Sequence, residues 1–217
     1  MSEIMVPAFV RGTTCIYAGR VYDLNESIAA SKYPMQVKPN VFNDDMTETV
    51  IKLALSAPGS GHDNWLMGVR VAFDIVMTAK ALVEAERYHF WDIVSCNSTM
   101  HRITRFDLDN AYCEYVDSRM KAVMTELVCE YKDNPTPENY LRVLYNNPAG
   151  FKYTMRVTTN YRQLKTIYKQ RKDHRLPEWR AFCEWIKTLP MSYLITGEDA
   201  DVQENGDADG ASCEKVQ

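Results

Sequence analysis

The amino-acid sequence predicts one domain of the α+β class, in which a mixed or antiparallel sheet packs against long helices. Two segments, residues 151–158 and 69–77, alternate apolar and polar side chains with the period of a half-buried strand. The longest segment with helical periodicity, residues 110–131, lies between them in the sequence. Long helices between widely separated strands are typical of α+β proteins.

Each predicted strand leads directly into a helix. Thr78 is placed to cap a helix over 79–88, and Thr158 and Thr159 are placed to cap the helix that follows the later strand. The spacing of apolar residues predicts the long helix over 110–131, and its inward positions are Tyr112, Val116, Met120, Val123, Leu127 and Tyr131.

The remaining predicted elements are shorter. The first forty residues have strand-and-loop character with a short helix near 25–32. A helix over 43–55 would begin at Asn43 or Asp44, and another is predicted over 138–145. Pro177 suits the first position of the last helix, whose inward residues are Phe182, Trp185, Ile186 and Leu189.

Length and charge define one folded body and a tail. The 217 residues are 46% hydrophobic and 25% charged, which is enough apolar material for a single sizeable core. Of the net charge of −4, the segment from Glu198 onward carries −6, from seven acidic residues and one lysine, so the rest carries about +2. We therefore expect one domain over residues 1–197 and a disordered acidic tail over 198–217.

The cysteine pattern and the hydropathy argue against a metalloprotein, a secreted protein and a membrane protein. The six cysteines form no CxxC pair, and no Cys/His cluster has zinc spacing, so the sequence predicts no metal site. The N-terminus does not read as a signal peptide, and no apolar run approaches the ~18 residues of a membrane span. We expect a cytoplasmic protein with reduced thiols and no membrane partner.

The segment 151–179 is the most informative part of the chain. A strand feeds its polar end into a helix, and nine Lys/Arg stand against Asp173 and Glu178 between Lys152 and Arg180. Free amide N–H groups at the helix start and nearby cations favour an anionic ligand. A solvated basic face beside a core strand is the alternative interpretation.

Two earlier segments also carry chemistry. Residues 59–64 place His62 and Asp63 on a glycine-containing turn before a strand, although an ordinary surface turn explains the same pattern. Residues 95–102 gather hydroxyls, an amide, an imidazole and an arginine in one predicted loop, which suits a nucleobase and phosphate or is only a polar connection. The chain has no GxSxG, Walker A or Rossmann glycine pattern.

These three places, in this order, resemble the flavin-dependent thymidylate synthases. That family has a GHE-type turn before a strand, the signature RHRxxSxNExSxR, and a late NxR…LR segment before a final helix. Here the turn reads Gly61-His62-Asp63, and the late segment reads Asn160-Tyr161-Arg162 with Arg171 nine residues later. The resemblance extends from about residue 30 to residue 189.

The signature departs from the family pattern at several positions. Aligned on Ser95 and Asn97, it keeps the serine, the asparagine and the final arginine, Arg102. Phe90-Trp91-Asp92 replaces the RHR triplet, and the glutamate and second serine are replaced by Ser98 and Met100. Phe90 and Trp91 would form either an aromatic wall for stacking or part of the core.

The resemblance implies a homotetramer with an α+β fold and active sites between subunits. Such an enzyme binds FAD and methylates dUMP to dTMP with a one-carbon unit from methylenetetrahydrofolate and hydride derived from NADPH. It implies that Arg171 stabilises negative charge as N3 of the uracil ring ionises. The expected catalytic residues are Arg171 and Ser95. The expected substrate-binding residues are Arg87, Ser95, Asn97, Ser98, His101, Arg102, Arg142 and Arg171, and the expected cofactor-binding residues are His62, Asp63, Asn64, His89, Asn160, Arg162 and Thr166.

Two alternatives remain open at this point. One is a divergent relative that binds dUMP or a related pyrimidine deoxynucleotide but performs changed chemistry, for example hydroxymethylation without flavin. The other is a non-enzymatic nucleic-acid-binding protein that uses the surface of residues 152–180; the acidic tail argues against it, and no specific nucleic acid is expected. We also expect Arg171 to lie exposed or in a cleft, so that its removal would leave stability unchanged.

Overall fold

The computed structural model describes residues 2–38 and 41–198, and its centre is an antiparallel sheet. Strand order is β1-β3-β4-β6-β5, and β2 pairs with β3 outside this path. The strands are β1 Glu3–Val6, β2 Phe9–Arg11, β3 Thr14–Tyr22, β4 Arg70–Thr78, β5 Asp92–Cys96 and β6 Lys152–Asn160. The predicted α+β class with an antiparallel sheet is confirmed.

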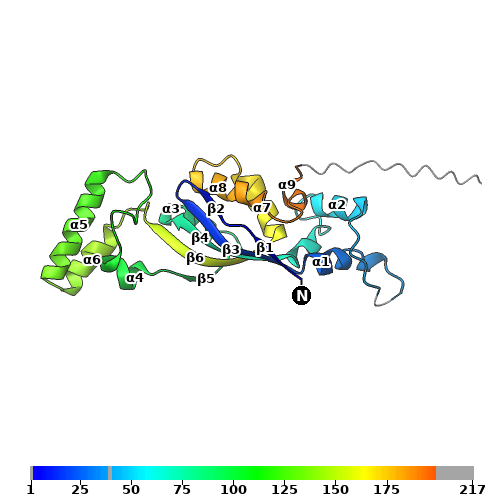
Figure 1. Cartoon of the computed structure of the whole chain (residues 1–217), viewed down its shortest axis with the longest axis horizontal. Coiled ribbons are helices and arrows are strands. Elements are labelled where there is room, and N and C mark those ends of the chain that lie inside the picture. Colours follow the sequence, from blue (N-terminus) through cyan, green and yellow to red (C-terminus); the bar gives the residue numbers. More distant parts are fainter. Residues whose placement is uncertain (1, 39–40, 199–217) are drawn as a thin grey trace, which may run out of the picture.

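The helices lie over one face of the sheet and beyond its two ends (Figure 1). Helices α7 (Tyr161–Arg171) and α8 (Pro177–Ile186) cover the face, while α5 and α6 extend beyond one end and α1 and α2 beyond the other. The remaining bounds are α1 Leu24–Ala30, α2 Glu48–Leu55, α3 Ala79–Ala85, α4 Thr99–Arg102, α5 Ser118–Asp133, α6 Pro137–Tyr145 and α9 Tyr193–Thr196. Short 3₁₀ helices span Tyr33–Met35, Asn64–Met67 and Ile103–Arg105.

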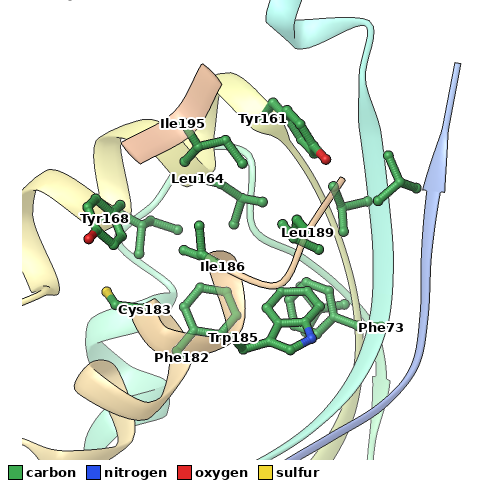
Figure 2. Close-up of a cluster of buried hydrophobic side chains, with 14 of the residues drawn as sticks. Phe73, Tyr161, Leu164, Tyr168, Phe182, Cys183, Trp185, Ile186, Leu189 and Ile195 are labelled. Carbon is green, nitrogen blue, oxygen red and sulfur yellow. The ribbon is translucent and has the colours of Figure 1, made fainter. Parts of the chain in front are cut away.

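The main core lies between the sheet and helices α7 and α8 (Figure 2). Alternation along β4 directs Phe73 inward, where its ring lies 4.7 Å from that of Trp185 and 5.6 Å from that of Phe182. Leu164 and Ile167 of α7 are fully buried in the same cluster, as their helical spacing predicts. The opposite sheet face carries half-exposed polar groups, among them the Asp74–Arg156 ion pair.

A second, smaller core joins α5 and α6 to the start of β6. Its buried members are Ile103, Tyr112, Met124, Leu127, Val128, Val143 and Phe151. The alternating segment that begins at Phe151 therefore contributes to two cores, because Met155 and Val157 belong to the main one. This places α5 and α6 on a lobe with its own packing, at the end of the sheet away from the start of α7 (Figure 1).

The predicted helix over 110–131 is wrong in its first third, and two of its predicted inward residues, Met120 and Val123, are exposed. Helix α5 begins at Ser118, because the Asp117 carboxylate accepts a hydrogen bond from the backbone N–H of Arg119 and caps it. Tyr112 instead forms a bridge with Phe151, and its hydroxyl donates to Asn147 Oδ1 at 3.0 Å. The apolar residues before Ser118 are spaced with a helical period, but this segment does not form a helix.

Three other sequence-based expectations need correction. Helix α2 begins at Glu48 with Thr47 as its cap, because Thr47 Oγ1 accepts from the backbone N–H of Val50, whereas Asn43 and Asp44 lie outside the helix. The cap of α7 is Asn160, since Thr158 and Thr159 complete strand β6. The predicted loop over 95–102 contains the end of β5 and helix α4. The predicted Thr78 cap of α3 is confirmed.

The described part of the chain ends at Glu198, which packs against the folded body. Tyr168 donates its hydroxyl proton to Glu198 Oε1 at 2.5 Å, and Lys187 Nζ lies 3.2 Å from Glu198 Oε2. Burial, together with the hydrogen bond to Glu198, raises the pKa of Tyr168 to about 12. Glu198 therefore belongs to the folded part, and the rest of the predicted tail, 199–217, lies outside the described residues. Within 2–38 and 41–198, none of the helices has the length and apolar content to span a membrane.

Candidate functional site

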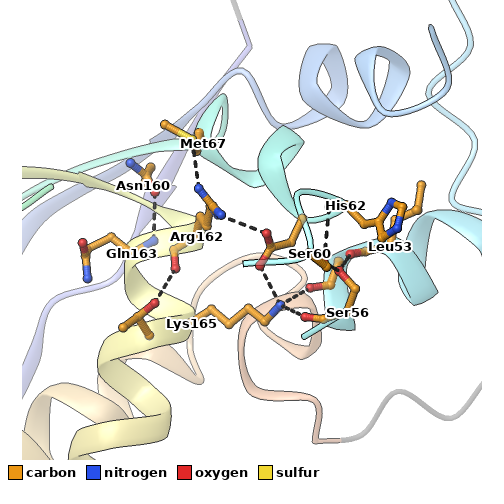
Figure 3. A network of polar contacts seen from close by, with 12 residues as sticks. Leu53, Ser56, Ser60, His62, Met67, Asn160, Arg162, Gln163 and Lys165 are labelled. Carbon is orange, nitrogen blue, oxygen red and sulfur yellow. Dashed lines mark hydrogen bonds and ion pairs between the residues drawn. The ribbon is translucent and has the colours of Figure 1, made fainter. Parts of the chain in front are cut away.

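The first element of the candidate site is a buried carboxylate beneath the start of α7 (Figure 3). Asp63 is 1% exposed, and its two oxygens form ion pairs with two cations of α7. One oxygen accepts from Arg162 Nε at 3.0 Å and the other from Lys165 Nζ at 2.9 Å. A buried carboxylate of this kind is stable only when paired and hydrogen-bonded. The structure thus joins the predicted turn and the predicted basic helix directly.

Lys165 holds the loop over 56–63 against α7. Besides Asp63, its ammonium group donates to the carbonyl oxygens of Ala54 at 2.6 Å and Ser56 at 2.7 Å. These three bonds use all three ammonium protons, so Lys165 has none left for a ligand. Arg162 keeps donors available: its Nη1 contacts only the Met67 sulfur at 3.5 Å, and Nη2 has no partner among the residues of the described ranges.

Two adjoining hollows lie beside this ion-pair cluster, and Phe90 lines both. The larger, of about 530 Å³, is bordered by residues from β3, β4, β5 and β6: Tyr22, Arg70, Val71, Ala72, Asp92, Thr158, Thr159 and Asn160, together with Met67. The smaller, of about 110 Å³, includes Asp63, Arg162 and Thr166. The backbone of Phe90 is fixed between them, since its N–H donates to Gln163 Oε1 and its carbonyl accepts from Thr159 Oγ1.

The residues around the hollows leave hydrogen-bond donors and an aromatic ring available to a ligand. Arg162 offers free guanidinium donors for a phosphate, and Phe90 offers an aromatic ring next to the larger hollow. His62 is exposed on the neighbouring turn, and its ring makes none of the described hydrogen bonds. Asn160 uses Oδ1 to cap α7, which leaves its amide N–H₂ for a ligand. Asn64 is exposed beside them, and Thr166 bonds back to the carbonyl of Arg162.

The second element of the site is Arg171, at the other end of α7. Its Nε donates to the Tyr88 hydroxyl at 2.7 Å, and its Nη1 donates to Glu84 Oε2 at 2.7 Å. The guanidinium carbon lies 4.9 Å from the centre of the Trp179 ring, close enough for a cation–π contact. The side chain is only 15% exposed. The side chain is therefore not exposed, and these contacts argue against the expectation that its removal leaves stability unchanged.

The turn before β5 runs along α7 between these two elements. Arg87 and His89 are exposed on it, and the His89 ring packs edge-on against the Phe90 ring with 4.6 Å between centroids. Trp91 is 5% exposed and contacts the rings of Phe73 and Phe182, so it belongs to the core and not to a stacking wall. Of Phe90 and Trp91, only Phe90 borders the hollows.

The third group of predicted residues lies at the far end of β6. Asn97 is fixed there because its backbone N–H donates to the Thr154 carbonyl and its Oδ1 accepts from the Thr154 N–H. Thr154 precedes Asn160 by six residues of strand, which corresponds to about 20 Å. One chain therefore separates Arg162 from the predicted substrate residues Ser95, Asn97, Ser98, His101, Arg102 and Arg142. The side-chain contacts of Arg171 are with Glu84, Tyr88, His174 and Trp179, and include none of that group in the described structure.

Within this third group, some side chains make contacts with other residues and others make none. Arg142 forms an ion pair with Glu130 at 2.6 Å on the lobe of α5 and α6. The side chains of Ser95, Ser98, His101 and Arg102 make no hydrogen bond with the part of the chain that the structure describes. Ser95 has no base beside it there, and Arg102 has no counter-ion.

Three residues that complete the site were not singled out in the sequence, and a fourth, Lys165, was expected to be available to solvent or a ligand but is engaged by protein groups. Gln163 and Lys165 lie on the α7 turn that faces Phe90 and Asp63, and Glu84 and Tyr88 hold Arg171 from α3 and the turn after it. Gln163 and Lys165 lie within the basic segment 151–179. Only their contacts with Phe90 and Asp63 in the folded chain set them apart from the other polar residues of that segment. No cluster of three or more His, Cys, Asp or Glu side chains with metal-site geometry occurs in ranges 2–38 and 41–198.

The fold is shared with solved structures, although the sequence matches no protein-family model and no curated protein. Thymidylate synthase X from Helicobacter pylori, crystallised with FAD and dUMP, matches 82% of this chain and 94% of its own with a TM-score of 0.61 and 16% identity. The UMP/dUMP methylase PolB from Streptomyces cacaoi, bound with 5-Br dUMP, matches 87% of this chain and 97% of its own, with a TM-score of 0.60 and 13% identity. The chain has the fold of these two enzymes.

Proposed function

We propose that this protein is an enzyme that methylates the pyrimidine ring of dUMP, in the manner of the flavin-dependent thymidylate synthases. The observation that carries the proposal is the pair of arginines along α7 within this fold. Arg162 borders the hollows at one end with free donors, and Arg171 is oriented at the other by Tyr88 and Glu84. Nine residues of helix separate them, about 14 Å, so one extended nucleotide-containing complex can contact both.

The chemistry assigned to Arg171 is electrostatic. Its guanidinium would donate to the uracil ring and stabilise the negative charge that develops as N3 loses its proton. The electron-rich C5 would then bond to the methylene carbon of methylenetetrahydrofolate and lose its own proton, while the bond from that carbon to the folate nitrogen breaks and tetrahydrofolate leaves. A reduced flavin, replenished by NADPH, would supply the hydride that converts the transferred carbon to a methyl group. No cysteine nucleophile is needed, and the buried Cys183 has its pKa raised to about 12 by burial.

The flavin would be held by the residues at the start of α7. Arg162 and the helix N-terminus suit its phosphates, and Phe90 suits a planar ring. His62, Asn160, Asn64, Thr166 and His89 are the additional polar candidates around it. Asp63 is assigned a supporting role, because both of its oxygens are already occupied by Arg162 and Lys165.

We propose further that the active site is completed by a second chain in a homotetramer. The support is that Arg102 and its neighbours lie about 20 Å of strand away from Arg162 and make no side-chain contact with Arg171 among the described residues. Arg102 and its neighbours at one end would meet the Arg171 region of another chain. Arg102 lacks a counter-ion among the described residues, which suits a cation reserved for a substrate phosphate.

A related enzyme with changed chemistry is the second candidate, favoured by the turn before β5. Trp91 is in the core, Phe90 replaces one cation of the family triplet, and Asp92 introduces a carboxylate at the larger hollow. Such a protein would bind dUMP without flavin reduction. A nucleic-acid-binding role is disfavoured, because Arg156, Arg162, Lys165 and Arg171 are paired with carboxylates, which reduces the number of free cations on this surface.

Calorimetry on one preparation tests the proposal and separates the two candidates. We expect dUMP to bind at least tenfold more tightly than deoxyuridine, because a charge-assisted arginine–phosphate bond is worth about 1.5–3 kcal/mol. FAD binding together with dUMP supports the synthase, and dUMP binding without FAD supports the relative with changed chemistry. A chain that binds neither nucleotide at millimolar concentration would overturn both.

A further inference from the structure

Glu84, on α3, makes the closest charged contact to Arg171. Its Oε2 accepts from Arg171 Nη1 at 2.7 Å and also from the indole Nε1 of Trp179 at 3.2 Å. The Glu84 side chain is 20% exposed and that of Arg171 is 15% exposed, so the pair is largely shielded from solvent. Two donors on one oxygen fix the direction of the carboxylate, and through it the direction of the guanidinium.

Tyr88 restrains Arg171 from a second side. Arg171 Nε donates to the Tyr88 hydroxyl at 2.7 Å, and that hydroxyl donates to Gln170 Oε1 at 3.0 Å. Burial raises the pKa of Tyr88, so the phenol keeps the proton that this arrangement needs. The guanidinium plane is thus held by bonds at Nε and Nη1 and by the Trp179 ring beneath it.

One nitrogen of the Arg171 guanidinium is not used by these contacts. Nη1 also lies 2.8 Å from His174 Nε2, but His174 Nδ1 accepts from the Leu176 backbone N–H, so in the neutral ring Nε2 carries the proton and cannot accept from Nη1. Nη2 has no hydrogen-bond partner within residues 2–38 and 41–198. Tyr88 and Glu84 therefore hold the guanidinium at Nε and Nη1, and the two protons of Nη2 stay available to a ligand.

We propose that Glu84 is a positioning residue that orients Arg171 so that Nη2 faces the pyrimidine ring. This inference rests on the proposed function, since it assigns the ligand-facing atom of the same site. Glu84 acts through Arg171 and does not itself touch the substrate. The other charged groups around the pair are Lys80, whose Nζ lies 3.9 Å from Glu84 Oε1, and His174.

Two possible roles of Glu84 predict opposite effects on a bound pyrimidine. If Glu84 only neutralised Arg171, removing its charge would strengthen the positive potential at the ring and lower the pKa of N3. If Glu84 positions Arg171, losing the hydrogen bond would let the guanidinium move, and the pKa of N3 would rise toward its value in water. Substitutions of Glu84 can therefore separate the effect of its charge from the effect of its hydrogen bond to Arg171.

The probe is 5-fluoro-dUMP, whose fluorine brings N3 ionisation toward neutral pH and whose ultraviolet spectrum reports that ionisation. We expect Glu84→Ala to raise the apparent pKa of the bound probe by about one unit, corresponding to a tenfold loss of preference for the anion. Glu84→Gln keeps an acceptor oxygen and should leave that pKa at or below the wild-type value. Glu84→Asp keeps the charge but withdraws it by one methylene group, and should raise the pKa as alanine does.

The matched control is Glu86→Ala, an exposed carboxylate just after α3, which should leave the bound-probe pKa unchanged. A lowered pKa in both Glu84→Ala and Glu84→Gln, or an unchanged pKa in Glu84→Ala and Glu84→Asp, would overturn the positioning role. If Glu84→Ala does not fold, Glu84→Asp decides. Failure of the proposed function gives a different result, in which the wild-type chain does not bind the probe at all.

Discussion

Replacing Asp63 by alanine is expected to lower the free energy of unfolding by about 3 kcal/mol, the lower end of the range for breaking a buried ion pair by removing one partner. The reason is that Asp63 is 1% exposed and serves two cations at once. Without it, Lys165, whose side chain is 13% exposed, becomes a largely buried cation with only carbonyl oxygens around it. Arg162 is 30% exposed and can turn to water, which keeps the loss at the lower end.

Urea denaturation of Asp63→Ala against wild type measures this loss. Asp92→Asn is the matched control, because Asp92 is an exposed carboxylate without a side-chain partner in the described part of the chain. A surface change of that kind should stay within about 0.5 kcal/mol. A loss below about 1 kcal/mol for Asp63→Ala would show that the cluster beneath α7 is solvated and does not hold the loop over 56–63.

Replacing Arg171 by alanine is expected to abolish detectable dUMP binding and also to lower the free energy of unfolding by about 1–3 kcal/mol. Binding fails because the donor toward the pyrimidine is lost. Stability falls because Glu84, 20% exposed, loses its charged partner, and because the Trp179 ring loses the guanidinium above it. The two losses have separate causes and are measured separately.

Calorimetry with dUMP and thermal denaturation of Arg171→Ala give the two values. Arg175→Ala removes the same charge four residues later from an exposed position and should change neither by a significant amount. Unchanged dUMP affinity together with lowered stability would assign Arg171 a purely structural role. It would also remove the reason for assigning Nη2 to the ligand.

The sequence predicted those parts of the fold that depend on local pattern. Alternation identified β4 and β6, and the change of period after Asn160 identified α7, because both signals arise from neighbouring residues. The start of α5 was missed because the apolar spacing around Tyr112 happened to be helical, while the Asp117 cap decided the boundary. A cap depends on one side chain and outweighs several periodic positions.

The candidate site was predicted as a set of residues but not as an arrangement. Asp63 and Arg162 were both singled out, yet their contact spans 99 residues of sequence. Glu84 was not singled out, because an acidic residue on a short helix looks like a solvated one until Arg171, 87 residues later, is placed beside it. The separation of Arg102 from Arg162 likewise follows from the length of β6 and from no feature of either residue.

The central claim, that dUMP binds where Arg171 of one chain meets Arg102 of another, is tested most directly by complementation. Arg102→Ala and Arg171→Ala chains carrying different tags are co-expressed, and assemblies that contain both are isolated by two successive affinity steps. Each variant alone should fail to bind dUMP, whereas the mixed assemblies should bind it, because some sites then receive both arginines. Mixed assemblies that form but bind no dUMP in calorimetry would contradict a shared site, and so would a wild-type protein that light scattering shows to be a monomer.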